Sequence, residues 1–313
     1  MANLQDMPRL SLLFLLLLSI PAVSSLVAHT FKKQIICGRP CLVVPSKSQL
    51  LFPTLIVLGG IAQTTSSWEH QLQSLSRNRN VIVYECLGQG RVDNDDSKAN
   101  VFANVTLPFQ AELFLSVLDE IVGQEERVDI AGFSFGGRVA MATACLQPKR
   151  IRKLHLTGVG CDRSDYGHLA MDACKDALHF DSSLRAFAWT ILLATYSPSY
   201  LRQLPTESRE RFLNFICSTN SREGLMAILD QAEVKDLTDP YHVSSMGDRL
   251  GLKIISKLCV GELDHMAPVD QVRLLQENLG SQDVDVVPNC GHAVAVENAR
   301  AWKDSVLSFF DQP

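Results

Sequence analysis

A serine set between small residues is the strongest chemical signal in this 313-residue sequence. The apolar run Val128–Ala131 leads directly into Gly132-Phe133-Ser134-Phe135-Gly136-Gly137, and a helical pattern follows. Gly-x-Ser-x-Gly between a strand and a helix predicts a tight turn, the nucleophile elbow, which exposes the serine hydroxyl at a helix N-terminus. A glycine-rich turn without catalytic meaning is the alternative, but the strand and helix on either side favour the elbow. We therefore interpret Ser134 as a nucleophile.

Such a serine needs a base to take its proton and a carboxylate to orient that base. His292, in Asn289-Cys290-Gly291-His292, follows the last expected strand and precedes the last expected helix. The preceding loop offers Asp264, with Glu262 as a competitor. We favour Asp264 because it lies farther into the loop. The chain order serine, acid, histidine also fits proteins with a nucleophile elbow.

Acyl transfer also requires hydrogen-bond donors for the negative oxygen that forms on the attacked carbonyl. The backbone N–H of Phe135, directly after the serine, is the first candidate. The second is the N–H of Ile61, in the loop Gly59-Gly60-Ile61 that follows an apolar run. Gly60 has no side chain, so we expect the backbone there to approach the substrate closely. This chemistry needs neither a cofactor nor a metal.

The elements that must position these residues are visible as alternating strand and helix patterns. Short apolar runs, mostly rich in β-branched residues, predict buried parallel strands at Thr54–Leu58, Val81–Tyr84, Val128–Ala131, Lys153–Thr157, Lys253–Val260 and Val284–Val287. Helical periodicity occurs at Trp68–Ser76, Pro108–Val122, Gly136–Leu146, Val269–Leu279 and Ala299–Phe309. This alternation predicts an α/β fold with a mostly parallel sheet and helices on both faces.

The alternation stops between residues 162 and 251, where only helical patterns occur. This insertion precedes the strand that leads to Asp264, so we expect it to fold over the carboxyl edge of the sheet, where sites of open α/β folds form. We predict a core made of residues 26–161 and 252–313, with residues 162–251 as a helical cap. A separate helical domain is the alternative, but the sheet pattern resumes afterwards.

Composition narrows the function classes further. With 46% hydrophobic and 20% charged residues, the chain is too apolar to be disordered. Its net charge of −5 argues against a nucleic-acid partner, which a basic stripe would indicate. The nine cysteines include no Cys-x-x-Cys pair, which argues against a zinc or redox site. Cys37 and Cys41 flank an expected turn and are candidates for a local disulfide.

The first 25 residues do not belong to the expected fold. Arg9 precedes an apolar stretch from Leu10 to Ile20, and Pro21 and small residues follow, which predicts a secretory signal peptide. We expect a secreted protein or one of the secretory pathway, with no stable membrane span after signal removal. The same segment also suits the first half of a bipartite plastid address. If it is retained it would be a membrane anchor, which Pro21 and the serines that follow disfavour.

With these residues in place, the chain resembles the α/β-hydrolase superfamily from about Pro53 to Phe310. The elbow through Met141 looks like that of a branch with ester and lactone hydrolases and the succinyl-hydroxycyclohexadiene-carboxylate synthase of the menaquinone and phylloquinone pathway. In that synthase an arginine four residues after the serine helps to hold the acidic substrate, and Arg138 matches it. Two further likenesses are Gly291-His292 followed by Glu297-Asn298, and Trp68. Two stretches depart from the pattern: Gly59-Gly60 replaces the usual His-Gly, and Glu85-Cys86-Leu87-Gly88-Gln89-Gly90 replaces Asp-x-x-Gly-His-Gly.

Three functions follow, in order of preference. The first is hydrolysis of a small-molecule carboxylic ester, thioester or lactone. The second is a lyase reaction of the synthase type, which would need further cations from Arg163, Arg185, Arg202 or Arg211. The third is a ligand-binding receptor that keeps the same residues and turns over slowly.

Overall fold

The computed structural model describes residues 31–91, 102–281 and 283–312, so the expected signal peptide lies outside the described residues. Its centre is an eight-stranded sheet with the order β1-β2-β4-β3-β5-β6-β7-β8. The strands are β1 (Lys32–Ile36), β2 (Arg39–Val44), β3 (Leu55–Leu58), β4 (Val81–Tyr84), β5 (Val128–Phe133), β6 (Ile151–Thr157), β7 (Ile255–Gly261) and β8 (Val284–Val287). β1, β2 and β4 pair antiparallel, and every other pair is parallel.

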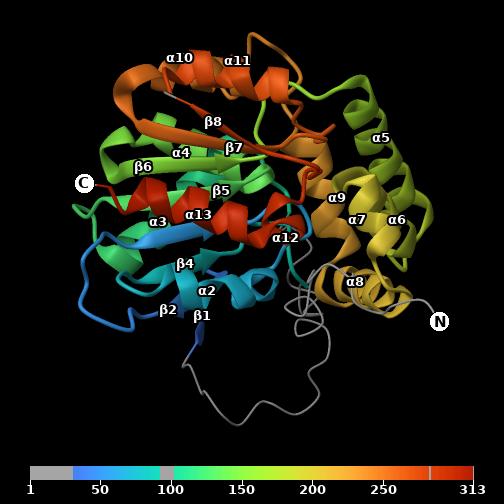
Figure 1. Cartoon of the computed structure of the whole chain (residues 1–313), viewed down its shortest axis with the longest axis horizontal. Helices are drawn as coiled ribbons and strands as arrows, with labels where there is room; N and C mark the ends of the chain where they lie inside the picture. The colour runs from blue at the N-terminus through green and yellow to red at the C-terminus, as the bar shows by residue number, and fades with distance from the viewer. Residues whose placement is uncertain (1–30, 92–101, 282, 313) are drawn as a thin grey trace, which may run out of the picture.

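Helices cover both faces of the sheet (Figure 1). α2 (Glu69–Leu75) and α13 (Ala299–Phe310) pack on one face, where Leu55 and Val57 of β3 meet Trp68 and Trp302. The intervening β3 residues, Ile56 and Leu58, point to the opposite face. That face carries α3 (Leu107–Val122), α4 (Phe135–Leu146), α10 (Val243–Leu250) and α11 (Val269–Leu279). The period-two alternation of a strand thus supplies two separate apolar cores.

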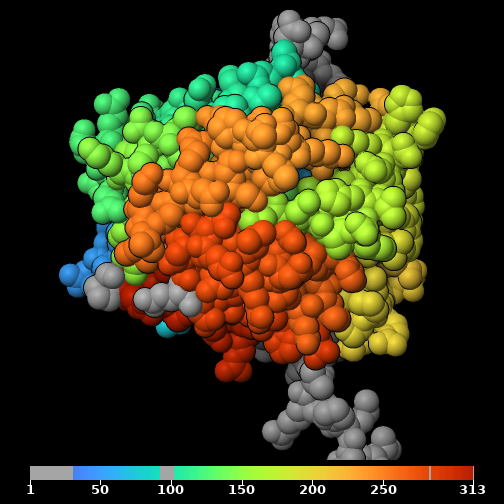
Figure 2. Space-filling model, turned by 90° about the horizontal axis from the view of Figure 1, so that it is seen from above, coloured from blue at the N-terminus to red at the C-terminus, as the bar shows by residue number. Residues whose placement is uncertain are grey.

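Five helices form a layer at one end of the sheet, to the right in Figure 1. They are α5 (Asp165–Phe180), α6 (Arg185–Thr195), α7 (Pro198–Gln203), α8 (Thr206–Thr219) and α9 (Arg222–Gln231). This helical layer has an apolar cluster of its own, which includes Phe187, Leu192, Leu213 and Leu225. Seen from above, its light-green part lies directly against the red-orange residues of the C-terminal part of the chain (Figure 2).

The expected mostly parallel sheet with helices on both faces is confirmed, and two elements differ from expectation. The hairpin of β1 and β2 was not expected, because β1 is an edge strand with two lysines and little buried surface. α10 lies inside the range expected as a cap, yet it packs on α4 and α11 of the sheet layer. The helical layer over the sheet end therefore consists of residues 165–231, followed by a return to the sheet.

Cys37 and Cys41, the candidates for a local disulfide, are not bonded to each other. The hairpin pairs Ile36 with Arg39 and Gln34 with Cys41, so Cys37 lies in the turn while Cys41 faces the core. All nine cysteines lie within the described ranges and are free. Across these ranges the structure has no helix that is both long and apolar enough to cross a membrane.

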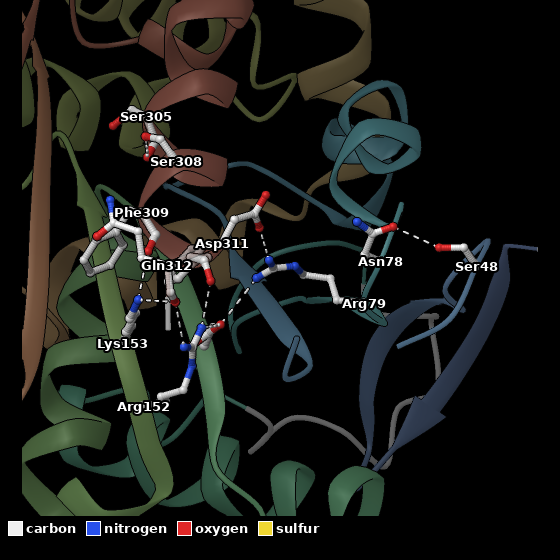
Figure 3. A network of polar contacts seen from close by, with 12 residues as sticks. Ser48, Asn78, Arg79, Arg152, Lys153, Ser305, Ser308, Phe309, Asp311 and Gln312 are labelled. Atoms are coloured by element: carbon white, nitrogen blue, oxygen red, sulfur yellow. Dashed lines mark hydrogen bonds and ion pairs between the residues drawn. The ribbon is translucent and has the colours of Figure 1, made fainter. Parts of the chain in front are cut away.

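A charged network ties the end of the chain to the sheet (Figure 3). The buried Asp129 carboxylate of β5 accepts hydrogen bonds from Arg152 at 2.8 and 2.5 Å and pairs with the buried Arg79 at 3.4 Å. Arg79 also pairs with Asp311, and Lys153 donates to the Gln312 carbonyl at 2.7 Å. Burial raises the pKa of Asp129, although the two arginines oppose this effect. Since Asp129 lies near the start of β5, the network stabilises the edge of the sheet opposite Ser134.

Candidate active site

Ser134 lies at the sharp turn between β5 and α4. Its backbone has φ 51° and ψ −117°, a conformation that costs a non-glycine residue about 1–3 kcal/mol. The neighbouring glycines are required by close approach: a Cβ on Gly136 would lie 2.4 Å from the Leu58 carbonyl oxygen, and one on Gly132 would lie 2.6 Å from the Gly137 Cα. The expected elbow is therefore the geometry that the chain adopts.

The structure brings His292 and Asp264 together. His292 Nδ1 lies 2.7 Å from Asp264 Oδ2, and both side chains are almost fully buried. The other carboxylate oxygen of Asp264 accepts hydrogen bonds from the backbone N–H groups of Met266 and Ala267, both at 2.8 Å. Asp264 is thus fixed by its own loop and directs one oxygen to the imidazole. The His292 ring in turn packs on the Phe133 ring, with centroids 5.2 Å apart.

Glu262, the competing carboxylate, has a different partner. It is exposed and accepts a hydrogen bond from the backbone N–H of Asn289 at 2.9 Å. It therefore braces the loop before the histidine without touching the imidazole. Between the two carboxylates, only Asp264 contacts His292.

Ser134 and His292 border one cavity of about 90 Å³. In the part of the chain that the structure describes, the Ser134 hydroxyl makes no hydrogen bond, and Ser134 borders the open space of this cavity. Gly60 also borders this cavity, and a Cβ on it would lie 3.2 Å from the Ser134 Cβ. Gly158 borders it too, and a Cβ there would lie 2.8 Å from the His292 Cε1. Small residues thus keep both faces of the serine–histidine region open.

Two backbone N–H groups beside the serine have no acceptor among the described residues: those of Phe135 and Ile61. Phe135 is the first residue of α4, so its N–H lies outside the helical hydrogen-bond ladder. The neighbouring N–H of Gly60 is already engaged, because it donates to Gln63 Oε1 at 2.7 Å. Gln63 therefore occupies the Gly60 N–H, whereas the Ile61 N–H stays free in the described part of the chain.

The sequence and the fold of this chain match known proteins. The model of the alpha/beta hydrolase family matches residues 55–304. This chain belongs to the α/β hydrolase family. Among curated relatives of the family, a 2-hydroxy-6-oxononadienedioate/2-hydroxy-6-oxononatrienedioate hydrolase of Paraburkholderia phymatum is 26% identical over 83% of this chain and 87% of its own length.

Solved α/β hydrolases have the same fold. MGS-M2, from a Medee basin deep-sea metagenome library, superposes with a TM-score of 0.71 at 20% identity, over 90% of this chain and 98% of its own. The enol-lactonase from Burkholderia xenovorans LB400 gives a TM-score of 0.70 at 17% identity, over 90% of this chain and its full length, 100%. At these identities the likeness concerns the fold.

Two arginines border the cavity of this family member. Arg138, from α4, lies beside Ser134 and has no ion-pair partner among the described residues, whereas Arg163 pairs with Glu233 at 3.1 Å. Burial lowers the pKa of Arg138 to about 9, and the nearby Arg163 charge adds to this effect, so Arg138 stays charged at neutral pH. The other candidate arginines, Arg185, Arg202 and Arg211, do not border this cavity. Of these four, the structure brings only Arg163 to Arg138.

Glu85, in a stretch that departs from the family pattern, and Trp68, which matches it, both have structural partners. Glu85 is buried and accepts a hydrogen bond from the Thr65 N–H at 2.9 Å, and burial raises its pKa. Trp68 packs on Phe133 and Trp302, with ring centroids 6.2 and 5.4 Å apart. Both residues therefore support the walls behind the loop of Gly60 and Ile61.

Sequence reasoning noted Glu297 only as part of a motif and missed its position. Its carboxylate accepts hydrogen bonds from the N–H of Gly291 at 2.9 Å and from that of Ser197 at 3.2 Å. The Ala293 N–H donates to the Thr195 carbonyl at 3.0 Å. The residues on both sides of His292 are thus bound to the junction of α6 and α7. Across the described ranges, no group of three or more His, Cys, Asp or Glu side chains is placed to hold a metal ion.

Proposed function

We propose that this protein is a serine hydrolase that cleaves a carboxylic ester, thioester or lactone. The observation that carries the proposal is the buried His292–Asp264 pair, 2.7 Å apart, on the cavity that the Ser134 hydroxyl also borders. A strained elbow, an oriented imidazole and two free N–H groups are the parts that acyl transfer requires. The family membership is consistent with this chemistry but does not select the substrate.

Each residue has a defined role in the proposed reaction. Ser134 Oγ attacks the substrate carbonyl carbon while His292 Nε2 takes the hydroxyl proton. Asp264 holds the imidazole and stabilises its charged form. The Phe135 and Ile61 N–H groups bind the carbonyl oxygen as it becomes negative. His292 then gives its proton to the leaving alcohol or thiol, and a water molecule activated by the same histidine releases the acyl group from Ser134.

We further propose that the substrate carries a carboxylate held by Arg138. A guanidinium without an ion-pair partner among the described residues, beside the nucleophile, is a site for a bidentate anion, and Arg163, which pairs with Glu233, borders the same cavity. The curated relative from Paraburkholderia is named for hydrolysis of dioates, which carry two carboxylates. The same pair of arginines favours the second candidate function, a synthase-type lyase in which Ser134 and His292 remove a proton and pyruvate is eliminated.

The helical layer is the proposed cap of this site. Met171 of α5, Ile191 of α6 and Phe212 of α8 border the cavity, so a substrate at Ser134 contacts the layer directly. Excluding water from this side strengthens the electrostatic interactions in the cavity. The proposed destination, the secretory pathway or outside, is based on residues 1–25 alone.

Labelling and turnover test the hydrolase proposal. Mature protein is treated with a fluorophosphonate probe and with short-chain nitrophenyl esters, and wild type is compared with Ser134→Ala. Ser116→Ala, on the exposed face of α3, is the matched control. We expect Ser134→Ala to lose both labelling and turnover, and the control to keep both. Labelling without turnover would favour the lyase or the slow receptor. A folded wild type that is not labelled would refute the role of Ser134.

The carboxylate proposal has its own test. Arg138→Gln is compared with Arg202→Gln, an exposed arginine outside the cavity, on a neutral ester and on the same ester bearing a carboxylate. A charged hydrogen bond contributes about 1.5–3 kcal/mol, so kcat/KM for the anionic ester should fall about 10-fold to 100-fold in Arg138→Gln only. An equal fall for both esters would contradict carboxylate binding by Arg138.

A further inference from the structure

A larger cavity lies beside the one at Ser134. Its volume is about 430 Å³, against about 90 Å³ at the serine, and α6, α7 and α8 form most of its wall. Most of the side chains that border it are apolar, among them Leu192, Leu204 and Phe215. We call this space the outer cavity. Nothing in the proposed reaction at Ser134 requires it.

The outer cavity abuts the catalytic one. Four side chains border both: Gln63, Tyr196, Phe212 and Ile216. Tyr196 is fixed in place, because its neighbour Thr195 accepts the Ala293 N–H at 3.0 Å. Its ring stacks on Tyr200 with centroids 5.1 Å apart. The two spaces therefore share one wall, and Tyr196 in that wall directly follows Thr195, which is hydrogen-bonded to the residue after His292.

The two sides of Ser134 differ in chemistry. Toward α9 lie the charged side chains of Arg138, Arg163 and Glu233. Toward the outer cavity the ionisable groups are few. Burial lowers the pKa of His70, so this imidazole is neutral at neutral pH, and Arg211 is paired with Glu207 at 3.2 Å. An extended molecule across Ser134 thus meets charge at one end and apolar surface at the other.

We propose that the outer cavity binds the apolar tail of the acyl substrate, whose carbonyl lies at Ser134. This inference rests on the proposed hydrolase function and adds a substrate class: acids and esters with a medium-length alkyl chain or an aryl group. Size supports it, since an apolar cavity of about 150 Å³ already holds a benzene ring. Transfer of each methylene from water into such a space is favourable, and no polar group has to be matched along the chain.

The test is a chain-length series of nitrophenyl esters from acetyl to octanoyl. In wild type, kcat/KM should rise with each added methylene, by up to about fourfold per step. Leu204→Trp, which fills the outer cavity, should remove this rise and leave acetyl turnover within about twofold of wild type. Leu193→Trp makes the same change on the exposed face of α6 and should keep the wild-type profile. Should Leu204→Trp fail to fold, Leu204→Phe takes its place.

A binding measurement separates this inference from the hydrolase proposal. Ser134→Ala is titrated calorimetrically with butanoate and octanoate, with and without Leu204→Trp. If octanoate binds more tightly than butanoate and Leu204→Trp abolishes this difference, the tail site is supported even if no ester is hydrolysed. Turnover that is flat from acetyl to octanoyl, with equal binding of the two acids, overturns the tail site while the hydrolase proposal stands. A rise with chain length that persists in a folded Leu204→Trp overturns it as well.

Discussion

Replacing Asp264 by asparagine tests the proposed catalytic pair with little change in shape. The Asp264 Oδ1 atom accepts two backbone hydrogen bonds at 2.8 Å, from Met266 and Ala267. An asparagine Oδ1 can keep both bonds, so its NH₂ group takes the place of Oδ2, which lies 2.7 Å from His292 Nδ1. That NH₂ group donates where the carboxylate accepted. His292 must then carry its proton on Nε2, the atom that has to accept the Ser134 proton.

The expected loss follows from this reversal. Asparagine at the acid of a serine protease triad reduces kcat by about 10⁴-fold through the same wrong tautomer. For Asp264→Asn we therefore expect kcat to fall by about 10³-fold to 10⁴-fold, or roughly 4–5.5 kcal/mol of transition-state stabilisation. The fold should persist, because the loop of Met266 and Ala267 keeps its hydrogen bonds. Circular dichroism and ester hydrolysis measure the two quantities.

Glu262→Gln is the matched control. Glu262 is a carboxylate two residues earlier in the same loop, but it bonds only the Asn289 N–H, at 2.9 Å. We expect its kcat to stay within about threefold of wild type. A folded Asp264→Asn that loses less than about tenfold would show that His292 does not depend on Asp264, and the reasoning would be wrong. A loss of kcat that is larger in Glu262→Gln than in Asp264→Asn would identify Glu262 as the residue that orients His292.

Three further predictions concern stability and positioning. Burial lowers the pKa of His155 from 6.5 to about 3, so the imidazole takes up a proton at a higher pH in the unfolded chain than in the folded one. Between pH 7 and 5 the unfolding free energy of the wild type, measured in urea titrations, should therefore fall by about 2 kcal/mol relative to that of His155→Gln. Equal pH dependence of the two unfolding free energies would contradict this. Asp129→Asn removes the buried carboxylate that Arg79 and Arg152 share, which leaves Asp311 as the carboxylate partner of Arg79. It should lower the unfolding free energy by about 3–5 kcal/mol, with Asp230→Asn, an exposed carboxylate, as a control near zero. Glu297→Ala should lower kcat about tenfold, because the Gly291 N–H loses its acceptor beside His292. Glu297→Gln retains one acceptor for this N–H and should recover part of the activity. Equal activity of the two variants and wild type would refute a positioning role.

Much of the fold was predictable from the sequence. The buried strands are visible in the sequence as continuous apolar runs, and β4 and β8 begin and end at the expected residues. The hairpin of β1 and β2 was missed because an edge strand with exposed lysines lacks that pattern. α10 was assigned to the cap because helical periodicity does not reveal which layer a helix packs against. One of its partners, α4, lies far away in the sequence, and the other, α11, follows only after β7.

The sequence by itself determined the elbow of Ser134. Glycines at fixed offsets after a buried strand permit one tight turn, since any side chain at Gly136 would overlap the Leu58 carbonyl. It also placed His292 and two candidate acids after neighbouring strands. These are local properties, because steric limits and periodicity act within a few residues along the chain.

Only the tertiary structure decided between carboxylates and between cations. Asp264 and Glu262 are chemically alike and two residues apart, and only the course of their loop sends one to His292 and the other to Asn289. Arg163 lies beside Arg138 because of how α5 and α9 pack around it. The residues next to Arg163 in the sequence do not indicate this position. The outer cavity is likewise a product of packing between α6, α7 and α8 and the sheet end. Contacts between segments far apart in the sequence depend on how whole helices and strands pack, and the periodicity of residues along the chain does not specify that packing.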